Sequence, residues 1–562
     1  MGSDDSIACI RRWISECDSK HLTCRLGLVG DAIEVEPQMP TRVIDVTSFD
    51  GHQLPRLIDT RGLKGKYVAI SHSWGTVVEP YTTTKNLASL KESIDFENMP
   101  KTFRDSVFIA RKLGVQYVWI DSVCIIQDDY EDWKREAKTM GLVYEKAYLT
   151  ISASDSSGDH AGFLTPNPSV EMDVSLPFQP GCPTSGHTYL RGQYTGVIDP
   201  RWTPISRRGW VLQERTLSRR ILHFDSTQVH WECSQYRVSE SGAIEDTTSN
   251  VNTSYFLGQN IKPLTGQNRG SGSSNHAERR KALRTLYHFY ACKVHEFSNC
   301  KLTRSSDKLP AILGLGNEIS RGTGIRCIEG HLFFEEPLFV YSLLWYTEMF
   351  SMEGSVIPDH VRAPSWSWAA MEGPRVFHLL GQDIEFERRI FLKIKSVLEV
   401  EALGSRPYSA LVCFGRAIAG IKGDPSRPSN GFLGLVDHMP LHQDDEQFQP
   451  LKPPTFSYQI LEAIDSKQHW PRRNVKGWVC FDSREFKPND VFFIPVCAPL
   501  VGQEDTHPET TRGCLGLVVV KAHVSEQHEV SNITNSFKRV GFGGLYGTSW
   551  FDQRNEEEFI LI

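Results

Sequence analysis

The sequence predicts an α/β protein in which a parallel sheet flanked by helices is followed by a helical segment and a β-rich carboxy-terminal module. Three observations support this prediction. Strand-type and helix-type patterns alternate over residues 66–160, helical spacing with many aromatic residues dominates to about residue 375, and short β-type runs follow after about residue 390. Alternating strands and helices are typical of a parallel sheet, because each helix carries the chain back to start the next strand.

The first elements follow from hydrophobic patterning. Residues 42–46 alternate apolar and polar side chains and predict a small strand. Residues 67–70 predict a second strand, after which the chain turns polar. Thr102, with Asp105 three positions on, resembles a capping box, so we expect a helix that starts there and stops at Gly114.

The next strand and helix have a clearer signature. Residues 115–120 are almost wholly apolar, which indicates a strand buried on both faces. Asp128 or Asp129 can cap the helix that follows. Its apolar side chains recur at spacings of three and four and are expected to face a core; they are Tyr130, Trp133, Ala137, Met140 and Tyr144. Residues 148–152 then resume a strand pattern.

The rest of the chain divides by composition. Residues 208–233 predict a short helix and two strands, whereas residues 249–277 are rich in Ser, Asn, Gly, Thr and Gln and predict a mobile loop or linker. We therefore predict five parts: an amino-terminal segment (1–60), the α/β domain (61–240), a flexible linker (241–280), a helical segment (281–385) and the β-rich module (386–562).

Composition excludes several functional classes. The 562 residues carry a net charge of -7, which argues against nucleic acid as the main partner. The amino terminus does not resemble a signal peptide, and no apolar stretch approaches 18 residues, so we expect no transmembrane segment. The 13 cysteines include no C-x-x-C pair, which favours reduced thiols and a cytoplasmic protein.

Polar residues follow three of the expected parallel strands. They are Ser71 to Gly75, Asp121 with Ser122, and Ser152 to Asp155. Ligands of open parallel sheets bind outside the carboxyl ends of the strands, so these side chains could hold ribose hydroxyls; alternatively, Asp121 caps the next turn. A nearby arginine cluster suits pyrophosphate or forms a solvated patch; it contains Arg207, Arg208, Arg215, Arg219 and Arg220.

Three segments in this order resemble the heterokaryon incompatibility (HET) domain of fungal proteins: YVAISHSWG, MPKTFRDSVFIARKLGVQYVWIDSVCIIQDDYEDWKREAKTM and RRGWVLQERTLSRRILHF. SDKLPAILGL and RAPSWSWAA are similar to segments that often follow it. The resemblance implies an effector of growth arrest or cell death when genetically different cells fuse. The domain also looks like a relative of the TIR fold, some members of which cleave NAD; this implies NAD as a substrate and no bound cofactor.

The same resemblance implies site residues. TIR-like hydrolases place a catalytic glutamate a turn after a tryptophan, and Trp133 with Glu136 offers that arrangement. A carboxylate there could stabilise the cation that develops on the ribose. The alternative is a structural role, in which Glu136 forms an ion pair with a neighbouring Lys or Arg on the helix. Taken together, the polar strand ends, the arginine cluster and this tryptophan predict substrate-binding residues, which are Ser71, Trp74, Gly75, Asp121, Ser122, Trp133 and Arg208. The alternative function is a non-catalytic module that assembles with itself or with another incompatibility protein.

The cysteines leave one question open. Cys17, His21 and Cys24, with Cys9 as a fourth candidate, have residue types compatible with zinc, but their spacing is not a common finger pattern. We therefore assign no metal ligand from the sequence, and buried thiols in a helical packing are the alternative. Cys124 lies in the apolar run VCII and is expected in the core.

Overall fold

The structure is a computed structural model. It forms two compact units: unit 1 comprises residues 1–285, 300–302 and 310–324, and unit 2 comprises 286–299, 303–309 and 325–562. The residues it describes are 1–46, 54–75, 81–165, 173–177, 187–191, 199–247, 254–265, 273–334, 337–347, 358, 361–373, 375–377, 389–400, 408–415, 418–421, 458–461, 475–482, 491–498, 513–522, 535–546 and 555–562.

A nine-stranded mixed sheet forms the centre of unit 1, in the order β11-β10-β9-β8-β5-β3-β4-β1-β2. The four neighbours β8, β5, β3 and β4 are parallel, which confirms the predicted α/β fold, and antiparallel strands extend both edges. The strands are β1 (Arg42–Asp45), β2 (Arg56–Asp59), β3 (Tyr67–Ser71), β4 (Tyr117–Trp119), β5 (Leu149–Ala153), β8 (Arg220–Phe224), β9 (Val229–Cys233), β10 (Tyr236–Ser239) and β11 (Ile244–Asp246). A separate hairpin pairs β6 (Asp173–Pro177) with β7 (His187–Arg191).

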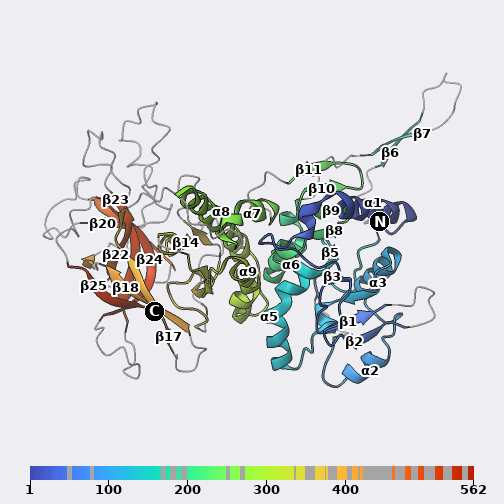
Figure 1. Ribbon diagram of the computed structural model, residues 1–562, viewed down its shortest axis with the longest axis horizontal. Coiled ribbons are helices and arrows are strands. Elements are labelled where there is room, and N and C mark those ends of the chain that lie inside the picture. The colour runs from blue at the N-terminus through green and yellow to red at the C-terminus, as the bar shows by residue number, and fades with distance from the viewer. Residues whose placement is uncertain are drawn as a thin grey trace. The chain divides into compact units, whose positions relative to one another are not determined.

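The order of the parallel strands creates a switch point beside β3. The chain runs from β3 to β4 on one side, crosses back to β5 on the other side and continues outward to β8. Right-handed crossovers therefore place α3 (Lys101–Leu113) on one face and α5 (Tyr130–Lys146) with α6 (Gly209–Leu217) on the other. In agreement, α5 contacts α6, and α3 contacts α1 (Asp4–Lys20), as Figure 1 shows. Ligands of such sheets bind at this switch point.

Helix boundaries in unit 1 confirm some predictions and correct others. Asp129 caps α5, accepting hydrogen bonds from the backbone N–H groups of Glu131 and Asp132, and Gly114 ends α3 at φ 72°. The capping box is wrong, because α3 begins at Lys101 without a side-chain cap. Thr102 and Asp105 instead accept backbone hydrogen bonds from residues 162–164, which fixes the loop after β5.

The buried stripe of α5 also differs from the prediction. Tyr130 is 68% exposed and Trp133 is only half-buried. The buried side comprises Asp132, Glu136, Met140, Gly141, Val143, Tyr144 and Glu145. Hydrophobic periodicity missed the first turns of this stripe because its buried members there are acidic and are compensated by arginine.

The expected linker contains regular structure. Residues 254–260 form α7 (Ser254–Asn260), a short 3-10 turn follows, and α8 (Ser273–Ser298) begins before residue 280. Leu257, Ile261 and Leu264 are buried and anchor this segment, although its composition is mostly polar. The rest of the range 249–277 lies outside the described residues. The five-part division of the chain stays a prediction.

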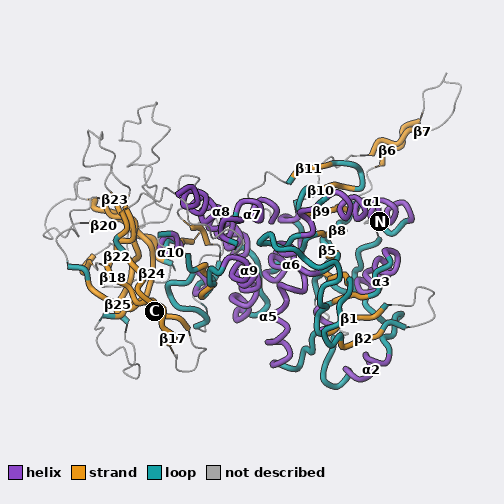
Figure 2. Tube along the Cα trace, in the orientation of Figure 1, coloured by secondary structure: helices purple, strands orange, loops and turns teal. Residues whose placement is uncertain are grey.

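Unit 2 has a partly helical beginning and a large β-sheet (Figure 2). Its sheet has ten strands, with β16-β22-β23-β24-β25-β18-β17 as the main path, which confirms the β-rich carboxy-terminal module. These strands are β16 (Arg389–Ile390), β17 (Lys393–Val400), β18 (Tyr408–Gly415), β19 (Ile418–Ile421), β20 (Tyr458–Leu461), β21 (Val475–Phe481), β22 (Val491–Ala498), β23 (Gly513–Lys521), β24 (Ser536–Tyr546) and β25 (Glu557–Leu561).

The remaining helices and strands lie outside the two large sheets. They are α2 (Leu87–Glu92), α4 (Asp121–Cys124), α9 (Lys308–Thr323), α10 (Leu338–Ser342), β12 (Cys327–Ile328), β13 (His331–Leu332), β14 (Trp345–Thr347) and β15 (Arg375–Phe377). Within the described part of the chain, no helix is both long and apolar enough to cross a membrane.

Candidate functional site

Polar side chains gather at the carboxyl ends of the central strands. His72 and Trp74 follow β3, Asp121 follows β4, Asp159 lies in the loop after β5, and Arg208 directly precedes α6. We call these five residues the strand-end cluster. Because β3 pairs in register with both β4 and β5, the three segments that follow these strands leave the sheet side by side.

Direct contacts join the members of the strand-end cluster. The Trp74 indole Nε1 donates to Asp121, lying 3.0 Å from each carboxylate oxygen. His72 Nε2 lies 3.1 Å from Asp159 Oδ1 and 3.7 Å from Asp121 Oδ1. The Arg208 guanidinium donates to the carbonyl of His72. One imidazole therefore lies between two carboxylates, and an indole and a guanidinium hold the surrounding backbone and side chains.

The cluster has a buried floor and a more open rim. The His72 side chain is 1% exposed and that of Asp159 is 4% exposed, whereas Asp121 retains 18% of its side-chain surface. Trp74 and Arg208 are half-buried, and Gly75 is exposed. A molecule that approaches the strand ends would therefore meet Trp74, Asp121 and Arg208 first.

Burial and neighbouring charge shift the pKa values of the floor. Burial opposes charge on His72, yet the carboxylates of Asp121 and Asp159 raise its pKa above the ordinary value. Glu214, on α6, is buried and hydrogen-bonded to Ser71, and desolvation raises its pKa to about 7. Tyr144, on α5, donates to the carbonyl of Ile70 at 3.0 Å. The strand ends thus hold a carboxyl group, that of Glu214, that changes protonation near neutral pH, beside an imidazole whose pKa is raised.

The loops behind the cluster meet at two glycines. Gly75 has φ +76°, and a Cβ built on it would lie 3.0 Å from the Cα of Gly158. A Cβ on Gly158 would lie 2.9 Å from the Cα of Gly75. Backbone therefore packs on backbone between the segments after β3 and β5. At the end of β4, Ser122 is buried, and its N–H donates to Asp121 Oδ1 at 2.7 Å, so Asp121 also stabilises the first turn of α4.

Glu136 makes its contacts elsewhere in unit 1. Its carboxylate is 4% exposed and lies 3.8 Å from Arg42 on β1 and 3.6 Å from Arg135. Both arginines also pair with Asp132. Burial raises the pKa of Glu136, with the arginines opposing that shift. Pairing of Glu136 with a neighbouring cation, the alternative to a catalytic role, is therefore present in the structure. The neighbouring Trp133 stacks on the Tyr130 ring at 6.1 Å.

Of the residues implied by the sequence, the structure brings Trp74, Asp121 and Arg208 into the strand-end cluster, with Ser71, Gly75 and Ser122 beside it. Sequence reasoning missed Asp159 and Glu214. Glu214 carried a signal: it follows the apolar run WVL in a short helix that was expected to flank the sheet. Asp159 follows the glycine of a small polar loop, and such a pattern gives no warning of a buried carboxylate.

Of the other four arginines in the predicted cluster, Arg207 is exposed, whereas Arg215, Arg219 and Arg220 make contacts within the domain. Arg219 donates to the carbonyls of Glu145, Cys24 and Ala147, and Arg220 is 4% exposed and pairs with Asp18 at 2.6 Å. Arg215 pairs with Glu232 at 3.1 Å. These side chains stabilise the domain internally. Cys124 is 1% exposed, as expected, and burial raises its pKa to about 12.

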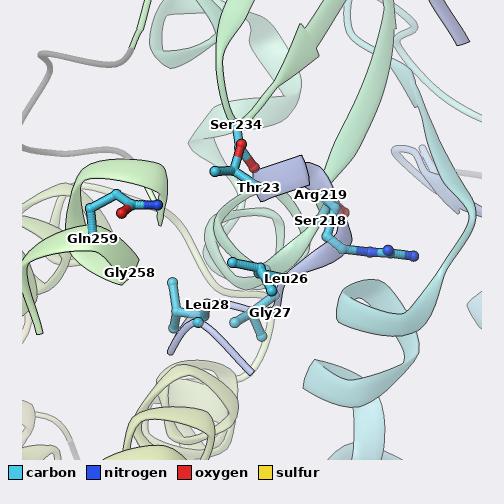
Figure 3. A pocket seen from close by; sticks show the side chains of 11 residues that line it. Thr23, Leu26, Gly27, Leu28, Ser218, Arg219, Ser234, Gly258 and Gln259 are labelled. Carbon is cyan, nitrogen blue, oxygen red and sulfur yellow. The ribbon is translucent and has the colours of Figure 1, made fainter. Parts of the chain in front are cut away.

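A pocket lies away from these strand ends, around Gly27 and Ser218 (Figure 3). It contains no acidic side chain, histidine or cysteine among its lining residues, so it offers no group for acid–base chemistry. Its lining comprises Thr23, Leu26, Gly27, Leu28, Gly30, Leu217, Ser218, Arg219, Ser234, Gly258 and Gln259. The strand-end cluster is therefore the better candidate for a reactive site.

Comparison with protein families places these observations in context. Residues 67–214 match the model of the family described as Heterokaryon incompatibility protein (HET). This segment is a HET domain. It contains β3, β4, β5 and most of α6, and so all five residues of the strand-end cluster. The HET domain implies a role in heterokaryon incompatibility. No curated protein and no solved structure gave a significant match.

Proposed function

We propose that the HET domain is the effector of a fungal incompatibility or cell-death response, and that it acts by hydrolysing NAD at the strand-end cluster. The observation that carries this proposal is the position of His72, Trp74 and Asp121 at the switch point of the parallel sheet. Nucleotides bind to open α/β sheets at such switch points, because loops diverge there.

The residues suit the parts of a nicotinamide dinucleotide. Trp74 offers an aromatic face for a base or nicotinamide ring, and Arg208 offers a guanidinium for phosphate. Cleavage of the bond between nicotinamide and ribose develops positive charge on the ribose. A carboxylate stabilises that charge or binds the ribose hydroxyls, and Asp121 is the most exposed carboxylate of the cluster.

Glu136 is the second candidate carboxylate. The resemblance to TIR-like hydrolases points to it, but it would have to leave its pairs with Arg42 and Arg135 to reach a substrate. Asp121 needs no such rearrangement. We therefore place Asp121 first and Glu136 second.

Nicotinamide release from NAD by the purified chain tests the proposal. We expect Asp121→Asn to lower the rate by roughly a hundredfold to a thousandfold, the effect of removing one electrostatic group from a transition state. Asp128→Asn is the matched control, because Asp128 is exposed and binds Thr84 rather than the cluster. Glu136→Gln, checked for folding, decides between the two carboxylates.

The outcomes separate the functions. A folded Asp121→Asn protein with the parental rate would remove Asp121 from the mechanism, and loss of activity in Glu136→Gln alone would transfer the role to Glu136. No release by the parental protein, alone or self-associated, would favour a non-catalytic module that assembles with itself or with another incompatibility protein. The pairing of Glu136 with two arginines is the observation that favours this second function.

A further inference from the structure

Three cysteines and one histidine converge next to the HET domain. Among the described residues, one group of side chains has the composition and spacing to hold a metal ion: Cys17, His21, Cys24 and Cys233. All four side chains are buried, and their ligand atoms lie within 4.8 Å of one another. His21 Nδ1 is 3.6 Å from the sulfur of Cys233. Cys9, the fourth candidate from the sequence, lies outside this group and its sulfur accepts a hydrogen bond from Arg12.

Local structure explains how distant residues meet. Cys17 lies in the last turn of α1 and His21 follows four positions later, where the N–H of His21 donates to the Cys17 carbonyl. A 3-10 turn over residues 22–25 then turns the chain back and places Cys24 beside them. Cys233 is the last residue of β9, on which α1 packs. The rings of Trp13 and Trp231 lie 6.5 Å apart and join the same two elements.

The distances are close to those of a tetrahedral zinc site. With Zn–S bonds of about 2.3 Å and a Zn–N bond of about 2.05 Å, tetrahedral angles separate two sulfurs by about 3.8 Å and a sulfur from the nitrogen by about 3.6 Å. The His21–Cys233 separation equals the second value. The other separations in the group are at most 4.8 Å, which is about 1 Å above the sulfur–sulfur distance around a bound ion.

The surrounding charge suits a metal bound to thiolates. Zn²⁺ with three thiolates and a neutral imidazole has a net charge of about -1. Arg220 is buried and interacts with the sulfur of Cys17 as well as with Asp18. Arg219 donates to the backbone carbonyl of Cys24 at 3.3 Å. The His21 ring also packs edge-on against the Tyr236 ring, with the ring centroids 5.1 Å apart, and this contact holds Nδ1 toward the sulfur of Cys233.

We propose that Cys17, His21, Cys24 and Cys233 bind one Zn²⁺ ion in a closed structural site. Four protein ligands leave no open position for a substrate, so the metal stabilises the fold rather than takes part in catalysis. Three ligands precede the HET match and one follows it. The ion therefore links α1 to β9, in the antiparallel part of the sheet. It also joins the segment that precedes the HET match to the segment that follows it.

Metal analysis of the full-length protein, purified without chelator, tests this site. We expect about one zinc per chain, loss of zinc in Cys24→Ala and Cys233→Ala, and retention of zinc in Cys9→Ala, the matched control on α1. His21→Cys keeps four ligands and should retain zinc, whereas His21→Ala should weaken binding at least tenfold. Chelation should lower the thermal midpoint and expose three thiols to a thiol reagent.

Two measurements on the parental protein test the site even if a variant fails to fold: the spectrum of the cobalt-substituted protein and the reactivity of its thiols. Replacement of zinc by Co²⁺ in the parental protein should give the thiolate charge-transfer and intense visible bands of tetrahedral coordination. The site would be overturned if the purified protein contained no zinc, reacted with the thiol reagent equally with and without chelator, and gave no such bands with Co²⁺. A disulfide between any two of the three cysteines would also overturn it. Full zinc retention in folded Cys233→Ala, with loss in Cys9→Ala, would overturn the ligand set proposed here.

Discussion

At the scale of single residues, buried charge distinguishes this HET domain from a simple hydrophobic core. His72, Asp159 and Glu214 lie at or beside the strand ends and are all at most 4% exposed. Such groups cost stability unless partners compensate them, and sites that bind ligands are where such a cost is commonly retained. Glu214, which lies beside the strand-end cluster, shows how such a buried group makes stability depend on pH.

Glu214 gives the clearest pH dependence. Its pKa rises from an ordinary 4.5 to about 7 in the folded chain. A raised carboxyl pKa contributes stability that is fully present below pH 4.5 and is lost as the pH rises through about 7. Glu214→Gln cannot ionise, so it should become more stable than the parent by roughly 2 to 3 kcal/mol at pH 8 and show no such gain at pH 4.

Urea unfolding of both proteins at the two pH values measures this difference. Glu92→Gln is the control for replacing a carboxylate by an amide, because the Glu92 side chain is exposed at the end of α2. An advantage of Glu214→Gln that is equal at pH 4 and pH 8 would show that packing, and not ionisation of Glu214, causes it.

At the scale of elements, two loops depend on each other at Gly75 and Gly158. Gly75 combines a left-handed backbone with a close backbone neighbour, Gly158 has only the close neighbour, and Gly242 has φ +92° with open space around it. The three glycines thus separate the two reasons for which a chain needs glycine. Both loops carry residues of the strand-end cluster, so their packing also positions the site.

Alanine at each of these positions should destabilise the chain in a fixed order. Gly242→Ala meets only the backbone penalty, of about 1 kcal/mol. Gly158→Ala forces two backbone segments apart and should cost about 1 to 3 kcal/mol. Gly75→Ala combines this clash with the backbone penalty and should therefore cost the most. Chemical denaturation gives the three values. Equal losses in all three variants would contradict the backbone contact.

At the scale of the whole molecule, local patterns predicted the central parallel strands, a helix cap at Asp128 or Asp129 and the stop at Gly114, because each depends on residues within one or two turns. They did not predict Cys233 beside Cys24, nor Asp159 beside His72, because such pairs depend on how the sheet brings distant segments together. The predicted buried stripe of α5 was wrong for another reason. Asp132 and Glu136 can be buried because they pair with Arg42, which lies on β1, far away in the sequence.

Unit 2 shows the same dependence on a distant partner. Arg539, on β24, is buried and its Nε lies 3.0 Å from Asp482, which directly follows β21. Its guanidinium also donates to the carbonyls of Leu343 and Trp345, and lies 3.5 Å from the centre of the Trp345 ring. One side chain thus connects the β-sheet of unit 2 to the segment around α10 and β14.

Removal of that cation should be costly, because the buried Asp482 loses its ion-pair partner and, among the charges that the structure describes near it, keeps only its weaker interaction with the buried Arg375. We expect Arg539→Met to destabilise unit 2 by about 3 to 5 kcal/mol. Asp482→Leu in the same chain should restore much of the loss, because the pair is then replaced by apolar side chains. Hydrogen exchange of residues 475–482 and 535–546 measures the effect locally, with the exchange of residues 67–71 as an internal reference in unit 1. If Arg539→Met left the exchange of β21 and β24 unchanged, the carbonyl contacts and the ion pair would contribute little to stability. If the double variant were no more stable than Arg539→Met, the loss would come from the contacts with the carbonyls and Trp345 instead of from Asp482.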